Sequence, residues 1–385
     1  MKALAVFKKA VLEQARDWLS LSLALSTAPF FVLLYWSFTG GGSTTYTILL
    51  MNMDRPVELA GETISAGEGV VEAMESVKYS SGQPMLKLVV ITDRDEALRQ
   101  LENRDANALV ILPPELTEGL LSGGVTRPEI TLVGDLSNPG YAVAAIFSGA
   151  SLDAYVQAMT GTPPAYELNE VALGGSADRT EFETYVPGLL IIAVMMLIFS
   201  VAMAVARDIE TGTLQRLQLT RMTAFDYLVG VSAAQVLVGI GALLFTFFVA
   251  WAIGFRSVGP LWAAIAIGVV TAFALVGIGL IIACFSKTVI KAFLVANAPF
   301  LLLMFFSGAI YPIPKLGLFS VAGHSIGMWD FLPPTHAVVA LNKVLSLGAG
   351  FGDVLYELSF LLVLSLVYFA TGVVLFRRTQ LSAQD

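Results

Sequence analysis

The sequence predicts a helical membrane protein with six transmembrane helices, cytoplasmic N- and C-termini, and an inserted extracytoplasmic α/β domain. Three observations predict this fold class. The 385 residues are 56% hydrophobic and 14% charged, with a mean hydropathy of +0.76, which is too apolar for a soluble globular protein. Six uncharged runs are each long enough to cross a bilayer. Residues 40–183 interrupt these runs and hold most of the acidic residues of a chain whose net charge is −8.

The chain begins with an amphipathic segment. Residues 2–17 place apolar side chains on one side of a helix and most of the charged ones on the other, which predicts a cytoplasmic interfacial helix over residues 1–18. Residues 19–38 follow as the first span. This run is too long for the apolar region of a signal peptide, so we expect it to remain uncleaved.

Strands and helices alternate within residues 40–183. The expected strands are 44–53, 86–92, 106–112 and 128–133, and the expected helices are 64–79, 93–103 with Asp93 as its cap, a short helix ending at Leu121, and 141–159. This alternation predicts an α/β domain built on at least part of a parallel sheet. The domain contains no histidine or cysteine and its acids have no paired spacing, so we interpret them as a solvated surface and assign no catalytic residue.

Five further spans are expected at residues 184–206, 228–255, 260–285, 292–311 and 358–376. With the N-terminus in the cytoplasm, the cytoplasmic segments, including the tail 377–385, hold eleven Lys and Arg residues, whereas the short outer loops hold three. The positive-inside rule therefore places residues 40–183 outside a bacterial-type cytoplasmic (inner) membrane.

Residues 312–353, between the last two spans, are too long for a turn and too apolar for an ordinary loop. Leu316–Met328 is expected to form a re-entrant or interfacial helix, and residues 335–347 a second short helix. Both histidines of the chain, His324 and His336, lie here with Asp330 between them. A metal or proton site is conceivable. Because Pro333 and Pro334 separate the two histidines, hydrogen-bonded interfacial side chains are favoured, and no metal site is assigned.

The polar loop 207–227 separates the second and third spans. Thr211 is expected to cap a short helix, Gly212 to permit its tight start, and Leu214 and Leu217 to share one helical face. Thr223 and Asp226 then have the spacing of a capping box before the next span. The plain alternative is an ordinary polar and basic cytoplasmic loop.

The residues from Glu210 to Leu214, with Leu217 and the return helix, resemble the cytoplasmic loop of ABC-2 type permeases, the membrane subunits of a class of ABC exporters. The stretches ANALVILPPELTEGLLSGG and DLSNPGYA are similar to the extracytoplasmic domain of one branch of that family, and FLPPTHAVVALNKVLSLG to its outer half-helices. The resemblance covers nearly the whole chain. It implies two copies of an ABC ATP-binding subunit and a second permease chain, identical or homologous. It also implies a coupling interface with the ATPase at Arg207, Glu210, Gly212, Thr213, Leu214, Arg216, Leu217 and Arg221.

No P-loop sequence occurs in the chain, so we expect a transport subunit that is not an enzyme and binds no cofactor, with ATP and Mg on the partner subunit. The resemblance implies export. No acid or base lies deep in a span, which favours an amphipathic, lipid-like or drug-like substrate over an ion-coupled carrier. Gln235, Thr271 and Asn297 are weak candidates for the substrate path, and helix packing is their alternative role.

Membrane lipid is an expected partner of the chain and nucleic acid is not. The alternative function is a non-transporting membrane receptor or scaffold that presents an extracytoplasmic ligand-binding α/β domain. That alternative predicts no ATPase partner and leaves loop 207–227 unexplained.

Overall fold

A computed structural model describes residues 2–38, 43–59, 61–103, 105–122, 127–135, 138–161, 179–218, 222–311, 313, 316–321 and 324–381. The chain divides into two compact units. Residues 42–171 form the first, the α/β unit. Residues 1–41 and 172–385 together form the second, the helical unit. Residues 179–183, expected in the inserted domain, therefore belong to the helical unit.

A four-stranded sheet with the order β4-β1-β5-β6 is the core of the α/β unit. Its strands are β1 (Tyr46–Asn52), β4 (Leu86–Val90), β5 (Ala108–Leu112) and β6 (Thr131–Val133). The central strand β1 pairs in parallel with β4 and β5, whereas β6 pairs antiparallel with β5. The predicted sheet is confirmed. A small antiparallel hairpin of β2 (Val57–Leu59) and β3 (Glu62–Ile64), which the sequence pattern did not predict, precedes the first helix.

The helices of this unit are α3 (Ala66–Glu75), α4 (Arg94–Glu102), α5 (Leu116–Leu121) and α6 (Pro139–Thr160). Asp93 caps α4 as predicted, because its side chain accepts hydrogen bonds from the amides of Asp95 and Glu96. The predicted start of α3 at Ile64 is wrong, since Ile64 ends β3 and Ser65 is the cap. Although α6 has the length and composition of a membrane span, it packs against α3, β1 and β5, and we therefore assign it to the helical layer of this unit.

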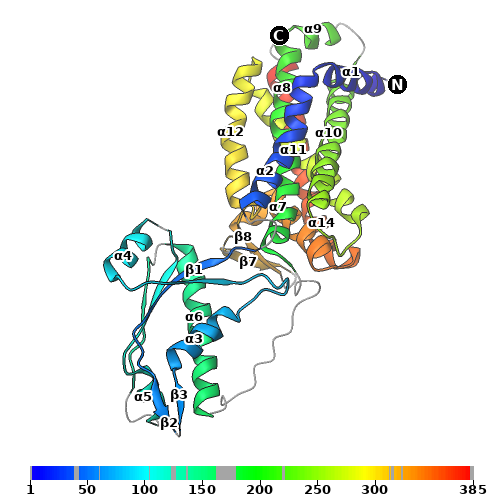
Figure 1. Ribbon diagram of the computed structural model, residues 1–385. Helices are drawn as coiled ribbons and strands as arrows, with labels where there is room; N and C mark the ends of the chain where they lie inside the picture. The colour runs from blue at the N-terminus through cyan, green and yellow to red at the C-terminus, as the bar shows by residue number, and fades with distance from the viewer. Residues whose placement is uncertain are drawn as a thin grey trace. The chain divides into compact units, whose positions relative to one another are not determined.

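The helical unit is a bundle of helices packed on one another (Figure 1). They are α1 (Lys2–Arg16), α2 (Trp18–Phe38), α7 (Glu181–Met195), α8 (Leu197–Glu210), α9 (Thr213–Gln218), α10 (Ala224–Ala252), α11 (Leu261–Cys284), α12 (Val289–Phe306), α13 (Pro333–Leu341) and α14 (Leu355–Phe376). By length and composition, the five segments 181–210, 225–252, 261–284, 289–306 and 351–380 can each cross a membrane. The five spans predicted after residue 183 are therefore confirmed as apolar helices of spanning length. The first of them breaks at Met196, between α7 and α8.

Helix α11 is the centre of the helical unit, packing against α14, α8, α10, α7 and α13. Small residues permit these close approaches. A Cβ at Gly277 would lie 2.6 Å from the backbone nitrogen of Phe369, so α11 and α14 touch backbone to backbone. Helix α12 differs, because only Ala292, Ala296 and Leu303 are buried along it, and it packs mainly on α8.

The helix predicted at Leu316–Met328 is wrong. The segment forms an antiparallel hairpin of β7 (Gly317–Val321) and β8 (His324–Gly327). A short apolar run fits a strand or a helix equally by periodicity, and the glycines at both ends of this one favour the hairpin. The second short helix is confirmed in part. It begins at Pro333 rather than Thr335, because proline is well suited to the first turn of a helix, and α13 continues into a π-helical turn at Asn342–Ser346.

Candidate functional site

The predicted coupling loop lies where α8 ends and α10 begins, at what we call the loop end of the helical unit. Thr211 does not cap α9, so that prediction is wrong. It is the C-cap of α8, and its hydroxyl donates back to the carbonyl of Arg207 at 2.8 Å. Gly212 follows with φ +68°, the left-handed conformation that commonly ends a helix. The chain thereby reverses tightly into α9.

One face of helix α9 packs against the rest of the helical unit. Leu214 is buried in an apolar cluster with Val6 and Tyr227. The exposed Arg216 donates through its guanidinium to the carbonyl of Thr211 at 3.0 Å. The capping box before α10 is confirmed, since Thr223 and Asp226 exchange hydrogen bonds.

The other predicted coupling residues are described only in part. The hydroxyl of Thr213 lies 2.9 Å from that of Thr211, within the turn. The side chain of Leu217 and all of Arg221 lie outside the described residues, so the structure does not test the predicted leucine face.

Two charged residues at the end of α8 contact other elements of the same unit. The guanidinium of Arg207 pairs with the carboxylate of Asp17, between α1 and α2, at 2.9 Å. The carboxylate of Glu210 accepts a hydrogen bond from the amide of Val289 at 2.9 Å. Val289 is the first residue of α12, so this bond satisfies one of the amides that every helix N-terminus leaves open. The loop is therefore linked both to α1 and to α12.

Asp208 was missed by the sequence analysis. Its carboxylate is buried and accepts hydrogen bonds from the ammonium of Lys9 at 2.7 Å and from the hydroxyl of Tyr227 at 2.8 Å. It thus joins α1, α8 and α10. The available signal was its position at the end of an apolar run, where a buried acid requires partners. The same contact face brings α1 close to α10, where a Cβ at Gly230 would lie 2.6 Å from the Cβ of Val6.

A cavity of about 1290 Å³ lies between α1, α2, α7, α8, α10 and α12. Its middle is lined mainly by apolar side chains, and its loop end carries the charged residues Glu13, Arg16, Asp17, Arg207 and Asp208. Gln235 and Asn297, two of the predicted path residues, both line this cavity. Thr271 does not line it, and its buried hydroxyl donates to the carbonyl of Ile267 in its own helix.

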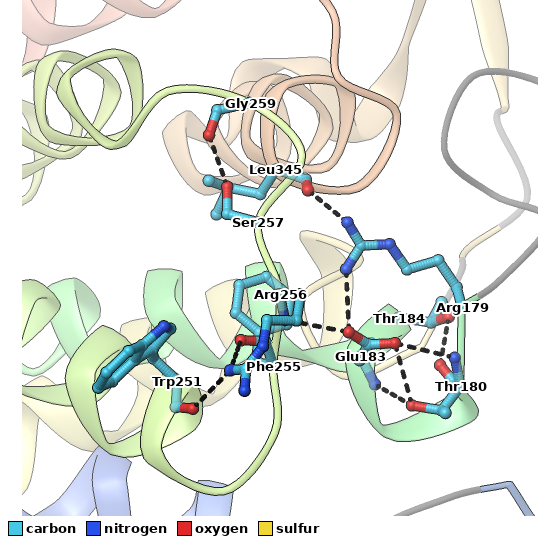
Figure 2. A network of polar contacts seen from close by, with 10 residues as sticks. All are labelled: Arg179, Thr180, Glu183, Thr184, Trp251, Phe255, Arg256, Ser257, Gly259 and Leu345. Atoms are coloured by element: carbon cyan, nitrogen blue, oxygen red, sulfur yellow. Dashed lines mark hydrogen bonds and ion pairs between the residues drawn. The ribbon is translucent and has the colours of Figure 1, made fainter. Parts of the chain in front are cut away.

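A second polar cluster closes the opposite end of the helical unit (Figure 2). The carboxylate of Glu183 accepts from the backbone amides of Thr180 at 3.1 Å and Arg256 at 3.0 Å, and pairs with the guanidinium of Arg179 at 3.4 Å. Arg179 also donates to the carbonyl of Leu345 at 2.8 Å. Burial lowers the pKa of Arg179, and the charge of Glu183 opposes that shift. This cluster, which the sequence analysis missed, ties the start of α7 to the turns after α10 and α13.

Of the two histidines, only His336 has a described side chain, so the structure does not test whether they form a site together. The ring of His336 is buried, stacks on Phe360 at 4.4 Å between centroids, and makes a 2.8 Å hydrogen bond to the carbonyl of Asp330. The side chain of His324 lies outside the described residues. Among the residues that were described, no group of three or more His, Cys, Asp or Glu side chains could hold a metal ion.

The comparison with known families gives one match. A family model described as ABC-2 family transporter protein matches residues 19–374, which include the α/β unit and most of the helical unit. A search of curated proteins finds no match.

Proposed function

Because the chain belongs to the ABC-2 transporter family, we propose that it is the membrane permease of an ATP-driven exporter. A separate ATP-binding subunit, in two copies, binds and hydrolyses ATP with Mg. A second permease chain, identical or homologous, completes the transporter. The substrate is amphipathic, lipid-like or drug-like, and it leaves the cytoplasm or the inner leaflet.

The positions of the basic residues support an orientation for this permease. Its loop end, which holds α1 and α9, faces the cytoplasm, and the segment 40–183 lies outside the cytoplasmic membrane. The charge asymmetry between the connecting segments is the physical reason, because Lys and Arg are retained on the cytoplasmic side.

The observation that carries the proposal is the connection between α9 and a cavity wall. Helix α9 is short, is fixed at its start by the Gly212 turn, and is anchored by Leu214. Glu210, just before that turn, holds the first amide of α12. Helix α12 lines the cavity and has few buried residues. A partner that moves α9 would therefore move a wall of the cavity.

Within this proposal the exposed face of α9 with Arg216 meets the ATP-binding subunit. Arg207 and Glu210, which already have partners in this chain, transmit the movement. Gly212 and Thr213 shape the turn, Leu214 anchors the helix, and Leu217 and Arg221 complete the face that the resemblance implies.

Co-purification of the full chain with a candidate ATPase, encoded beside it, tests this function. The wild type should retain the ATPase in mild detergent, whereas Arg216→Glu and Gly212→Pro should release it or uncouple its activity. Arg99→Glu, an exposed charge reversal in the α/β unit, is the matched control and should retain it. If the wild type retains no ATPase, the proposed function is wrong, and a receptor or scaffold whose α/β unit binds a ligand takes its place.

A further inference from the structure

We propose that the cavity between α2 and α12 binds one lipid-type amphiphile with an anionic head group. Its head meets Arg16 at the loop end, and Gln235 donates to an oxygen further along the molecule. The inference rests on the proposed function, since such a molecule would be the transported cargo, and it names a binding site and a ligand class for the proposed path.

The size and length of the cavity favour an extended ligand over a compact one. Its volume of about 1290 Å³ exceeds the roughly 300–1,000 Å³ of pockets for drug-sized molecules. Its lining runs along α7 and α8 from Leu189 to Asp208. At a rise of 1.5 Å per residue this distance is about 28 Å, close to the roughly 30 Å thickness of the hydrocarbon core. A ligand with long acyl chains matches this length.

The middle of the cavity offers an apolar surface for such chains. An aromatic cluster forms one wall, where Phe199 of α8 lies 5.5 Å from Phe293 and 5.0 Å from Phe300 of α12, measured between ring centroids. Ile192, Met304 and Leu34 extend the wall toward the opposite end. Acyl chains are as apolar as these side chains, so the wall contacts the chains through its shape and offers them no polar partner. The polar group of the ligand is therefore expected at the charged end of the cavity.

Gln235 provides a hydrogen-bond donor at half depth. The residue is only 2% exposed, and its carbonyl oxygen accepts from the hydroxyl of Ser200 at 2.7 Å. The structure shows no partner for its amide nitrogen among the described residues, although the side chain lines the cavity. The amide nitrogen is therefore a donor that is open to a molecule in the cavity. An ester, amide or hydroxyl oxygen of the ligand would satisfy it.

The spacing between this donor and the charged end is set by α8. Ser200, the partner of Gln235, lies seven residues before Arg207, which is roughly 10 Å along the helix. A ligand that fits both places therefore carries its ionic head at one end and a second polar group within roughly 10 Å of it, before the chains begin.

The pairing of charges at the loop end selects the sign of the head group. The carboxylate of Asp17 pairs with Arg207, and those of Glu13 and Asp208 share the ammonium of Lys9. Arg16 lines the same end, and within the described part of the chain its guanidinium has no ion pair or hydrogen bond. A guanidinium with open donors binds phosphate or carboxylate in a bidentate manner. The head group is therefore expected to be anionic.

Native mass spectrometry of the full chain in neutral detergent tests the inference. Phosphatidylglycerol and phosphatidylcholine with identical acyl chains serve as probes. The wild type should bind one phosphatidylglycerol in preference to phosphatidylcholine, and Arg16→Gln should reduce that preference about tenfold. Lys8→Gln, an exposed residue of the same helix that does not line the cavity, is the matched control and should change nothing.

The donor at half depth is tested separately. Gln235→Leu should weaken binding of both lipids about fivefold, and Asn297→Leu is a second variant on the facing wall in case the first does not fold. Thr271→Val is the control, because Thr271 lies in a span but outside the cavity.

The results separate this inference from the proposed function. Equal losses in Arg16→Gln and Lys8→Gln, or in Gln235→Leu and Thr271→Val, would mean unspecific attraction to the surface and would overturn the site. Because these measurements need no ATPase, specific binding without ATPase co-purification would leave the site standing and remove the exporter. ATPase co-purification without specific lipid binding would overturn the site and leave the proposed function standing.

Discussion

Replacing Glu210, the last residue of α8, by alanine should loosen the connection between the turn before α9 and α12 while leaving the fold intact. The wild-type carboxylate accepts from the amide of Val289 at 2.9 Å and lies at the N-terminus of α12. Thr288 already satisfies a different amide, that of Lys291, so it does not replace Glu210. The substitution removes one hydrogen bond and one anion from a helix N-terminus.

The magnitude follows from these two contributions. A typical hydrogen bond contributes about 0.5–1.5 kcal/mol, and an anion at a helix N-terminus about 0.3–1 kcal/mol. Glu210 is exposed, so water screens both contributions, and about 1 kcal/mol is the expected net loss. That corresponds to roughly a fivefold shift from the linked to the unlinked arrangement.

Spin labels on Gln215 of α9 and Lys291 of α12 would report the shift by pulsed electron paramagnetic resonance. Both side chains are exposed, and the single cysteine of the chain, Cys284, is buried and can be replaced by alanine beforehand. The Glu210→Ala variant should broaden the distance distribution and, under the proposed function, lower the amount of substrate transported per ATP. Glu210→Gln keeps an acceptor oxygen without the charge and should give an intermediate result.

Arg216→Gln is the control for the distance measurement, because the described hydrogen bond of the Arg216 guanidinium goes to Thr211, within the same turn. It should leave the distribution narrow. A Glu210→Ala distribution as narrow as that of the wild type would show that the 2.9 Å bond does not hold α12, and transmission from α9 to the cavity wall would have to follow another route.

Three further outcomes are expected. Gly230→Ala should displace α1 at a cost of about 1–3 kcal/mol, and the displaced helix should be cleaved faster by a protease. Gly241→Ala in the same helix has space for its methyl group and should leave the rate of cleavage unchanged. Glu183→Ala, which leaves a buried guanidinium unpaired, should lower the free energy of unfolding by about 3 kcal/mol, while Glu96→Ala at an exposed pair should leave the melting temperature unchanged. Gly212→Ala should destabilise the turn by about 1 kcal/mol. Gly212→Asn should destabilise it by less, because asparagine tolerates the left-handed conformation. Equal melting temperatures for the two variants would contradict this expectation.

Much of the fold could be predicted because strong local signals agree with the tertiary structure. Uncharged runs of spanning length have few alternatives to apolar helices. Capping residues such as Asp93 and Thr223 fix a helix start through their own side chains, so the prediction needs no knowledge of neighbours. The alternation of strands and helices likewise predicted the sheet of the α/β unit, although not its β2–β3 hairpin.

The predictions failed where a short segment fits two local structures equally well, or where distant contacts decide the structure. Threonine is a common N-cap residue, yet α8 continues up to Thr211, and the Thr211 hydroxyl donates to the carbonyl of Arg207. The apolar run Leu316–Met328 fits a helix and a hairpin equally well. The role of Asp208 depends on Lys9, 199 residues away in the sequence, and no local pattern announces that pair. That Gln235 lines the cavity and Thr271 does not could also be learned only from the three-dimensional structure.

The insertion of the α/β unit between α2 and α7 constrains how the protein is made. Helix α2 packs on α7 and α10, and both are synthesised only after residues 42–171. At ribosomal rates of about 5–20 residues per second, those 130 residues delay the partners of α2 by roughly 7–26 s. Under the proposed topology, in which α2 is the first span, α2 must persist in the bilayer alone during this interval. Its 21 residues without a charge meet that requirement, and the contiguous α/β unit can complete its sheet before the helices assemble.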